Sequence, residues 1–120
     1  MSERARGRRR CRLTSRSPIA LTESYERHDL HSTVSFAAFE HVMTLIASVY
    51  QVPASQVHMD DRFDELALYD PPVPDEERLD LSELVREEAA SRGHEVDLSR
   101  VFTVRDLVRL YGHLERSVKA

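Results

Sequence analysis

The stretch DEERLDLSELV, residues 75–85, decides how the rest of this chain can fold. It follows a loop with three prolines in nine residues and begins an acidic helix. Asp75 can act as the N-cap of this helix, and Glu76 and Glu77 suit the positive end of the helix dipole. We therefore predict a helix over residues 76–92.

This helix should have an apolar face and an acidic face. The apolar residues expected to turn inward are Leu79, Leu81, Leu84, Val85 and Ala89. The acidic residues expected on the outer face are Asp80, Glu83, Glu87 and Glu88. Gly93 suits the C-cap, because glycine adopts the left-handed conformation required there without steric cost.

Helical periodicity also marks the segments before and after this helix. Apolar residues spaced three and four apart predict a helix over residues 33–50, capped by Ser32 or Thr33. Phe63 and Phe102 are expected core anchors of the loop 51–66 and of a short helix within 95–102. A last helix should start at Thr103, which forms a capping box with Asp106. No strand alternation occurs, so the predicted fold class is all-α.

Composition places the chain among small soluble domains. The sequence has 120 residues, of which 41% are hydrophobic and 32% charged. No apolar run approaches the roughly 20 residues that span a bilayer, so we expect no membrane insertion and a cytoplasmic location. The single cysteine, Cys11, excludes an internal disulfide and a cysteine-based zinc site.

The first residues have a charge opposite to that of the rest. Residues 1–16 contain seven arginines, from Arg4 to Arg16, against Glu3 alone, whereas the remainder has 10 basic and 20 acidic residues. We expect residues 1–31 to be a disordered basic leader and residues 32–118 to be the folded domain. The leader could bind nucleic acid or an anionic surface, act as a targeting peptide, or be a solvated tail or a translated upstream segment.

Several of these motifs together resemble the acyl carrier protein family. LIASVYQVPASQVHMDDRFDEL, residues 45–66, is similar to its first helix and following loop, with the D-x-x-F-x-x-L anchor at Asp60, Phe63 and Leu66. FTVRDLVRLYGHL, residues 102–114, is similar to its closing helix. The resemblance covers roughly residues 36–115 and implies a right-handed bundle of three long helices plus one short helix.

The chain departs from that family at the residue that carries its chemistry. The family's D-S-L reads Glu77-Arg78-Leu79 here, and arginine offers no nucleophile to which 4'-phosphopantetheine could be joined. We therefore expect no cofactor. The preceding loop is also longer than in the family, and Glu88 and Arg92 fall where the family places bulky apolar residues. A charge facing the interior would be costly unless it were paired.

The resemblance implies an interaction protein that has lost its attachment site. It would dock a basic patch of a partner enzyme in fatty acid, polyketide or peptide biosynthesis, acting as a structural or regulatory subunit. The docking residues implied are Glu76, Glu77, Asp80, Glu83, Glu87 and Glu88. Two alternatives are a genuine acyl or peptidyl carrier modified at another serine, of which Ser82 is nearest, and a nucleic-acid-binding protein that uses Arg4–Arg16.

No other motif indicates catalysis. The six histidines complete no metal site, and no catalytic triad order, glycine-rich phosphate loop or His-Glu-x-x-His run occurs. His41 should be an ordinary surface residue. We expect no enzymatic activity and no metal.

Overall fold

The computed structural model describes residues 17–66 and 76–117, and within them every regular element is a helix. The long helices are α3 (Phe36–Tyr50), α5 (Glu76–Ser91) and α6 (Val104–Ser117). Two shorter α-helices, α2 (Leu21–Arg27) and α4 (Phe63–Leu66), and the 3-10 turns η1 (Leu30–Ser32) and η2 (Ala54–Gln56) complete the described part. The all-α prediction is thus confirmed for the described residues.

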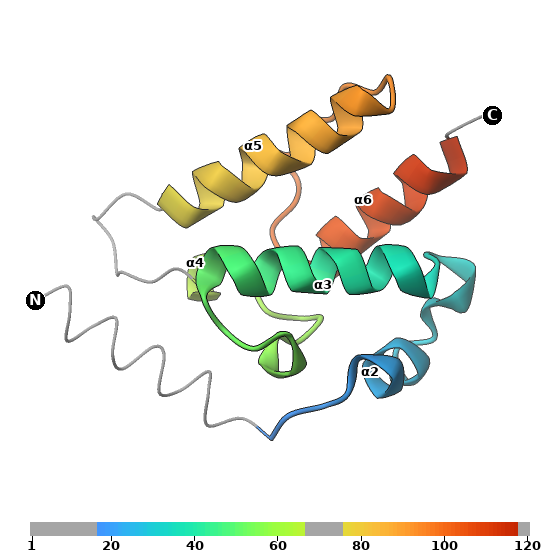
Figure 1. Ribbon diagram of the computed structural model, residues 1–120, viewed down its shortest axis with the longest axis vertical. Helices are drawn as coiled ribbons and strands as arrows, with labels where there is room; N and C mark the ends of the chain where they lie inside the picture. Colours follow the sequence, from blue (N-terminus) through green and yellow to red (C-terminus); the bar gives the residue numbers. More distant parts are fainter. Residues whose placement is uncertain (1–16, 67–75, 118–120) are drawn as a thin grey trace, which may run out of the picture.

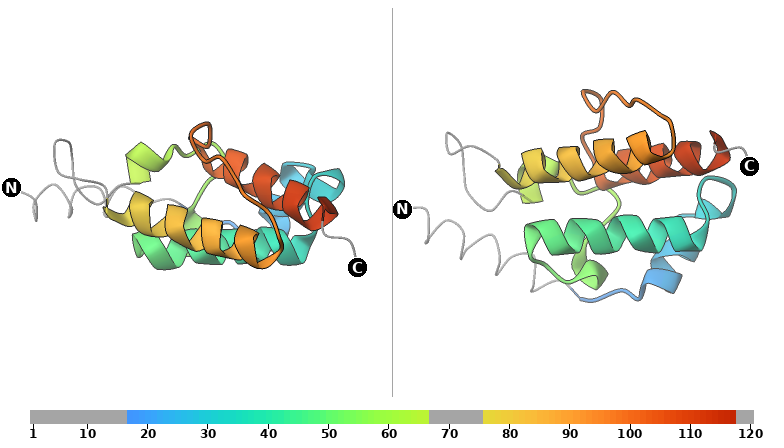
Figure 2. Two further views of the ribbon diagram at one scale, coloured as in Figure 1. Left: turned by 90° about the horizontal axis from the view of Figure 1, so that it is seen from above. Right: turned by 45° about the horizontal axis from the view of Figure 1, so that its top comes forward.

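Helix α3 is the central element of the fold. It packs against α5, α6 and α2, and Figure 1 shows α5 and α6 on one side of it and α2 on the other. Figure 2 shows the same arrangement from two further directions. The predicted stripe of α3 is buried at Phe39, Val42, Met43, Ile46 and Tyr50.

The start of α3 differs from the predicted one. Ser35, rather than Ser32 or Thr33, is the N-cap, and its hydroxyl accepts a hydrogen bond from the Ala38 amide at 3.2 Å. Glu115 of α6 fixes this cap by accepting bonds from the amide and the hydroxyl of Ser35, both at 2.7 Å. A contact from a helix 80 residues away thus reinforces the cap.

Gly112 allows the turn before α3 to approach α6 closely. A Cβ atom at this position would lie 2.1 Å from the carbonyl oxygen of Thr33. No side chain fits at that distance, so the closest approach of the two segments requires glycine. The predicted role of Gly93 at the end of α5 is confirmed, since this glycine has a φ of 79°.

Residues 17–31 are not a disordered leader, and this part of the prediction is wrong. Tyr25 of α2 and Leu30 of η1 are buried in the common core. The Tyr25 hydroxyl donates a hydrogen bond to the carbonyl of Val34 at 2.6 Å, and its ring packs on Phe36 and Phe39. Two large apolar side chains are enough to hold this short segment, although it shows little periodicity. Residues 1–16 lie outside the described residues.

The predicted short helix within residues 95–102 is absent from the described structure, where these residues form an irregular segment with a turn. The carboxylate of Asp97 accepts a bond from the Ser99 amide at 2.9 Å. A side chain that bonds its own backbone in this way competes with helix formation. Leu98 nevertheless reaches the core, with 7% of its surface exposed.

The capping box predicted for the last helix is confirmed. The carboxylate of Asp106 accepts bonds from the amides of Phe102 and Thr103, and the Thr103 hydroxyl accepts one from the Asp106 amide. This arrangement turns the Phe102 side chain outward, so that 52% of it is exposed. The prediction that Phe102 is a core anchor is therefore wrong.

Candidate functional site

The first turn of α5 contains Arg78, whose side chain is tied to two other segments. Its guanidinium donates a hydrogen bond to the carbonyl of Val101 and lies over the ring of Phe63, 4.9 Å from the centroid. An arginine over an aromatic ring contributes about 0.5–2 kcal/mol, more when it is shielded from water. Arg78 therefore fastens α5 to α4 and to the segment before α6.

The Phe63 ring that contacts Arg78 is held in place by the core. It is 1% exposed and stacks on Tyr50, with ring centroids 6.2 Å apart. Its amide donates to the carbonyl of Phe102 at 2.9 Å, next to an isolated bridge between Arg62 and Thr103. The prediction that Phe63 and Leu66 anchor this loop is confirmed, since both are buried.

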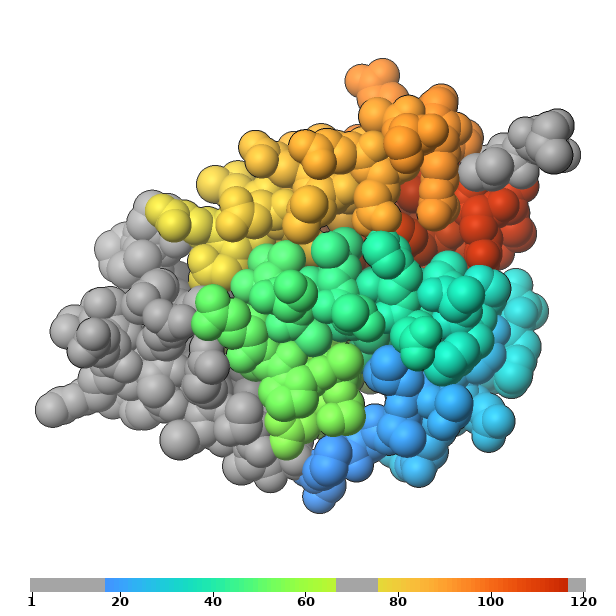
Figure 3. All heavy atoms as spheres, in the orientation of Figure 1, coloured from blue at the N-terminus to red at the C-terminus, as the bar shows by residue number. Residues whose placement is uncertain are grey.

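An acidic groove lies between α5 and α3. It has a volume of about 390 Å³ and is lined by Ser48, Val49, Asp80, Glu83, Leu84 and Glu87. Figure 3 shows the surface of α5, yellow to orange, lying along the green surface of α3. Three carboxylates thus surround two aliphatic side chains, and we call this surface the acidic groove.

The carboxylates of the acidic groove have no basic partner within the described part of the chain. None of the ion pairs or hydrogen bonds there involves the side chains of Asp80, Glu83 or Glu87. Asp80 and Glu83, and then Glu83 and Glu87, are like charges three or four residues apart on a helix. Each such pair destabilises an isolated helix by roughly 0.2–0.5 kcal/mol.

The predicted acidic face is correct for most of its members. Glu76, Asp80, Glu83 and Glu87 are exposed and Glu77 is partly exposed. Glu88, in contrast, is half-buried on the inner edge of α5, so the prediction that it lies on the outer face is wrong. Tyr111 donates its hydroxyl proton to one oxygen of Glu88, and the ring of His41 lies 2.7 Å from the other.

These two partners explain how a carboxylate fits at an inner position. Burial first, and the hydrogen bond to Glu88 second, raise the pKa of Tyr111 well above its ordinary value, so the phenol stays a donor. The carboxylate is thereby paired, as an inward charge requires. His41, expected to be an ordinary surface residue, joins α3 to α5 through this contact.

The inner stripe of α5 is narrower than predicted. Leu81, Val85 and Ala89 are buried, whereas Leu79 is 63% and Leu84 38% exposed. Because successive helical residues are 100° apart, five apolar residues at these spacings cannot all face one neighbour. The prediction is wrong for Leu79 and Leu84, which instead add apolar surface beside the exposed acidic residues.

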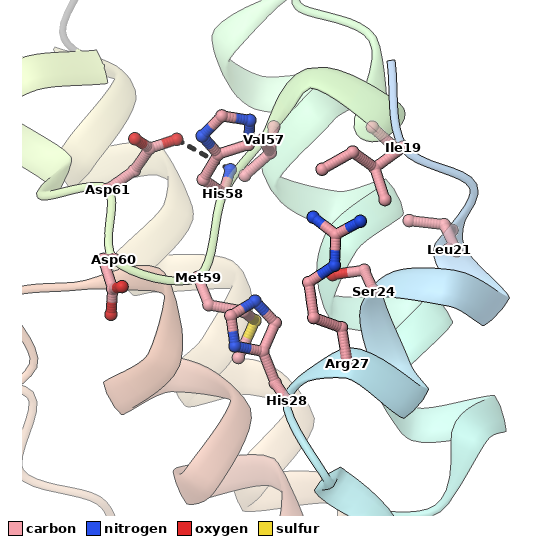
Figure 4. Close-up of a pocket in the computed structure, with 11 residues that line it drawn as sticks. Ile19, Leu21, Ser24, Arg27, His28, Val57, His58, Met59, Asp60 and Asp61 are labelled. Carbon is pink, nitrogen blue, oxygen red and sulfur yellow. Dashed lines mark hydrogen bonds between the residues drawn. The ribbon is translucent and has the colours of Figure 1, made fainter. Parts of the chain in front are cut away.

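A second cavity, of about 290 Å³, lies between residues 19–28 and 54–61. Figure 4 shows Ile19, Leu21 and Arg27 facing Met59 and the 58–61 loop across it. Burial, and then the charge of Arg105, lower the pKa of His28, whose Nδ1 lies 3.2 Å from the Arg105 guanidinium. His28 is thus held neutral as an acceptor, which suits a structural contact of the N-terminal segment.

The described residues show no further arrangement that indicates a metal site or a membrane-spanning helix. They contain no cluster of three or more histidines and acids that could hold a metal ion, and none of their helices is long and apolar enough to cross a membrane. Ser82 is half-buried in the second turn of α5. Arg4–Arg16, the Asp75 cap and the proline-rich loop lie outside the described residues.

Comparison with protein-family models, with curated proteins and with solved structures finds no significant match to this chain.

Proposed function

We propose that this protein is an acyl-carrier-like interaction protein that docks a basic surface of a biosynthetic enzyme through α5 and carries no phosphopantetheine. The order of its helices and the D-x-x-F-x-x-L anchor support the carrier-like part of the proposal. Neither catalysis nor a bound cofactor belongs to this function.

The observation that carries the proposal is the acidic groove. Like charges placed along one helix face cost stability, and no ion pair within the described residues offsets them. A face needed only for solubility could mix both signs of charge at no such cost. An unpaired acidic face beside the exposed Leu79 and Leu84 suits a basic partner with some apolar surface.

The environment of Arg78 supports the absence of the prosthetic group. By the resemblance Arg78 stands in place of the attachment serine, and its side chain is held by Phe63 and Val101. Replacing a nucleophile by a residue fixed in packing gives this position a structural role.

Two measurements with purified protein test the proposal. Intact mass after incubation with a phosphopantetheinyl transferase and coenzyme A should show no added phosphopantetheinyl group. A mass gain would favour the carrier modified at another serine, and Ser82→Ala would then show whether Ser82 is the site. Titration against a panel of carrier-dependent biosynthetic enzymes should identify a partner whose binding weakens with salt. Failure of every enzyme to bind would contradict the docking function.

A further inference from the structure

We propose that the cavity between residues 19–28 and 54–61 binds a small uncharged organic molecule, which has an apolar body and a hydroxyl group that bonds Ser24. This cavity shares no lining residue with the acidic groove. The proposal therefore requires neither the docking function nor the likeness to carrier proteins.

Apolar side chains from both segments line the cavity and suit the body of such a ligand. They are Ile19, Leu21, Ala54, Val57 and Met59. Val57 and Met59 are only 4% and 1% exposed, so this part of the wall is continuous with the core. An apolar cavity of about 150 Å³ is enough to hold benzene. The cavity here, of about 290 Å³, can take a ring with a short substituent.

The hydroxyl of Ser24 is a free hydrogen-bonding group on the α2 side of this cavity. Ser24 is 8% exposed, and its hydroxyl has no hydrogen-bond partner among the residues that the structure describes. Figure 4 shows the Ser24 side chain directed from α2 toward the loop that carries Met59. A buried hydroxyl without a partner costs stability, and a ligand that bonds it would remove that cost.

A second polar atom of the same kind comes from the loop. Nε2 of His58 is buried and has no hydrogen-bond partner in the described part of the chain. The loop is held in place there, because the His58 amide donates to the carboxylate of Asp61 at 2.8 Å. Buried polar atoms without a partner are uncommon in folded proteins. A hydroxyl and an imidazole nitrogen can each donate or accept, so a ligand hydroxyl suits both.

The charged side chains that line the cavity already have partners, which favours an uncharged ligand. Arg27 forms an ion pair with Glu23, and Asp60 accepts a hydrogen bond from Arg105 at 3.2 Å. The remaining carboxylate, that of Asp61, is bonded to the loop amide described above. A charged ligand would have to displace one of these partners or remain unpaired, and an unpaired buried charge is costly.

Benzyl alcohol and toluene are suitable probes, because they share a ring and differ by one hydroxyl group. In the isotope-labelled full-length protein, each should shift the NMR amide signals of Ile19, Ser24, Val57 and Met59 until the shifts saturate. Benzoate should bind more weakly than benzyl alcohol, because Arg27 is already paired. Shifts that do not saturate, or that spread over the whole molecule, would overturn the proposal.

The role of the Ser24 hydroxyl can be separated from the shape of the cavity. Ser24→Ala should weaken benzyl alcohol binding about fivefold, since one hydrogen bond is lost, and leave toluene binding unchanged. Ser32→Ala, at an exposed position outside the cavity, is the control and should change neither affinity. Benzyl alcohol affinity that is the same in Ser24→Ala and wild type would contradict recognition of the ligand hydroxyl.

A larger side chain in the wall tests whether the probes enter the cavity. Ala54→Leu should abolish binding of both probes, whereas Ala37→Leu, at an exposed position of α3, should bind them like wild type. Saturable binding that survives Ala54→Leu would place the probes elsewhere and overturn the site. A long-lived water beside Ser24, with no saturable binding of any probe, would assign the cavity to water and overturn it as well.

Discussion

The guanidinium of Arg78 lies 4.9 Å from the centroid of the Phe63 ring, and this contact joins the first turn of α5 to α4. Under the proposed likeness to carrier proteins, Arg78 would stand in place of the serine that bears phosphopantetheine. Its guanidinium also bonds the carbonyl of Val101. Arg78 thus joins three parts of the described fold, namely the first turn of α5, α4 and the segment before α6.

The Arg78–Phe63 pair should show energetic coupling. In a double-mutant cycle of Arg78→Ala and Phe63→Leu, the free energies of unfolding should be non-additive by about 0.5–2 kcal/mol. Arg86→Ala, at an exposed position of the same helix, should show no coupling to Phe63→Leu. Additive effects for Arg78 would mean that the stacking contributes nothing.

Phe63 and Phe102 should differ sharply in how much they contribute to the free energy of unfolding. Phe63→Ala should lower the free energy of unfolding by about 3–5 kcal/mol, because it leaves a cavity in the core. Phe102→Ala should change it by less than about 1 kcal/mol, because half of that side chain is already exposed. Chemical denaturation measures both values, and equal losses would contradict the orientation of Phe102.

Residues 17–31 should be needed for full stability. Tyr25→Phe removes the bond to the Val34 carbonyl and should cost about 1 kcal/mol, and Tyr25→Ala should cost more. Glu26→Ala, on the exposed face of α2, is the matched control and should leave the melting temperature nearly unchanged. A melting temperature unaffected by Tyr25→Ala would show that α2 does not pack on the core.

The capping box of α6 should make stability depend on acid pH. Burial tends to raise the pKa of Asp106, but bonds from the Phe102 and Thr103 amides and the Thr103 side chain outweigh it and hold the pKa below the usual value. The stabilisation is therefore present above the unfolded pKa of about 3.9 and is lost as the pH falls through the folded pKa.

The pH dependence can be measured by substitution. Asp106→Ala should cost about 0.5–2 kcal/mol near neutral pH, and the difference from wild type should shrink as the pH falls below about 4. Denaturation at several pH values provides the comparison, with Asp80→Ala as the control for an exposed carboxylate. A cost that stays constant down to low pH would contradict the role of the Asp106 charge.

Local signals in the sequence were sufficient to predict that the three long helices exist. The stripe of α3, the glycine after α5 and the Thr103–Asp106 box each depend on residues within a few positions of one another. The end of α5 and the start of α6 follow from such short-range chemistry, whereas α3 begins later than predicted. Phe63 and Leu66 were expected to be core anchors of the loop, and both residue types are among those most often buried.

Contacts between distant residues account for the errors. Helical spacing placed Glu88 on the outer face, whereas the resemblance placed it at an inner position. Its partners Tyr111 and His41 could not be recognised, because they are 23 and 47 positions away. The role of Tyr25 depends in the same way on ring contacts with α3. The acidic character of α5 could be predicted from the sequence. The groove beside Ser48 and Val49 could not, because it is formed only when α3 packs against α5.

The central claim is that a partner docks on the acidic face of α5, and the salt dependence of partner affinity tests it most directly. For an enzyme that binds the wild type, affinity should be measured at several salt concentrations for Glu83→Lys/Glu87→Lys and for the equally charged control Glu26→Lys/Glu40→Lys. The account predicts that the groove reversal weakens binding and flattens the salt dependence while the control binds like wild type. Equal binding of both variants at every salt concentration would contradict it.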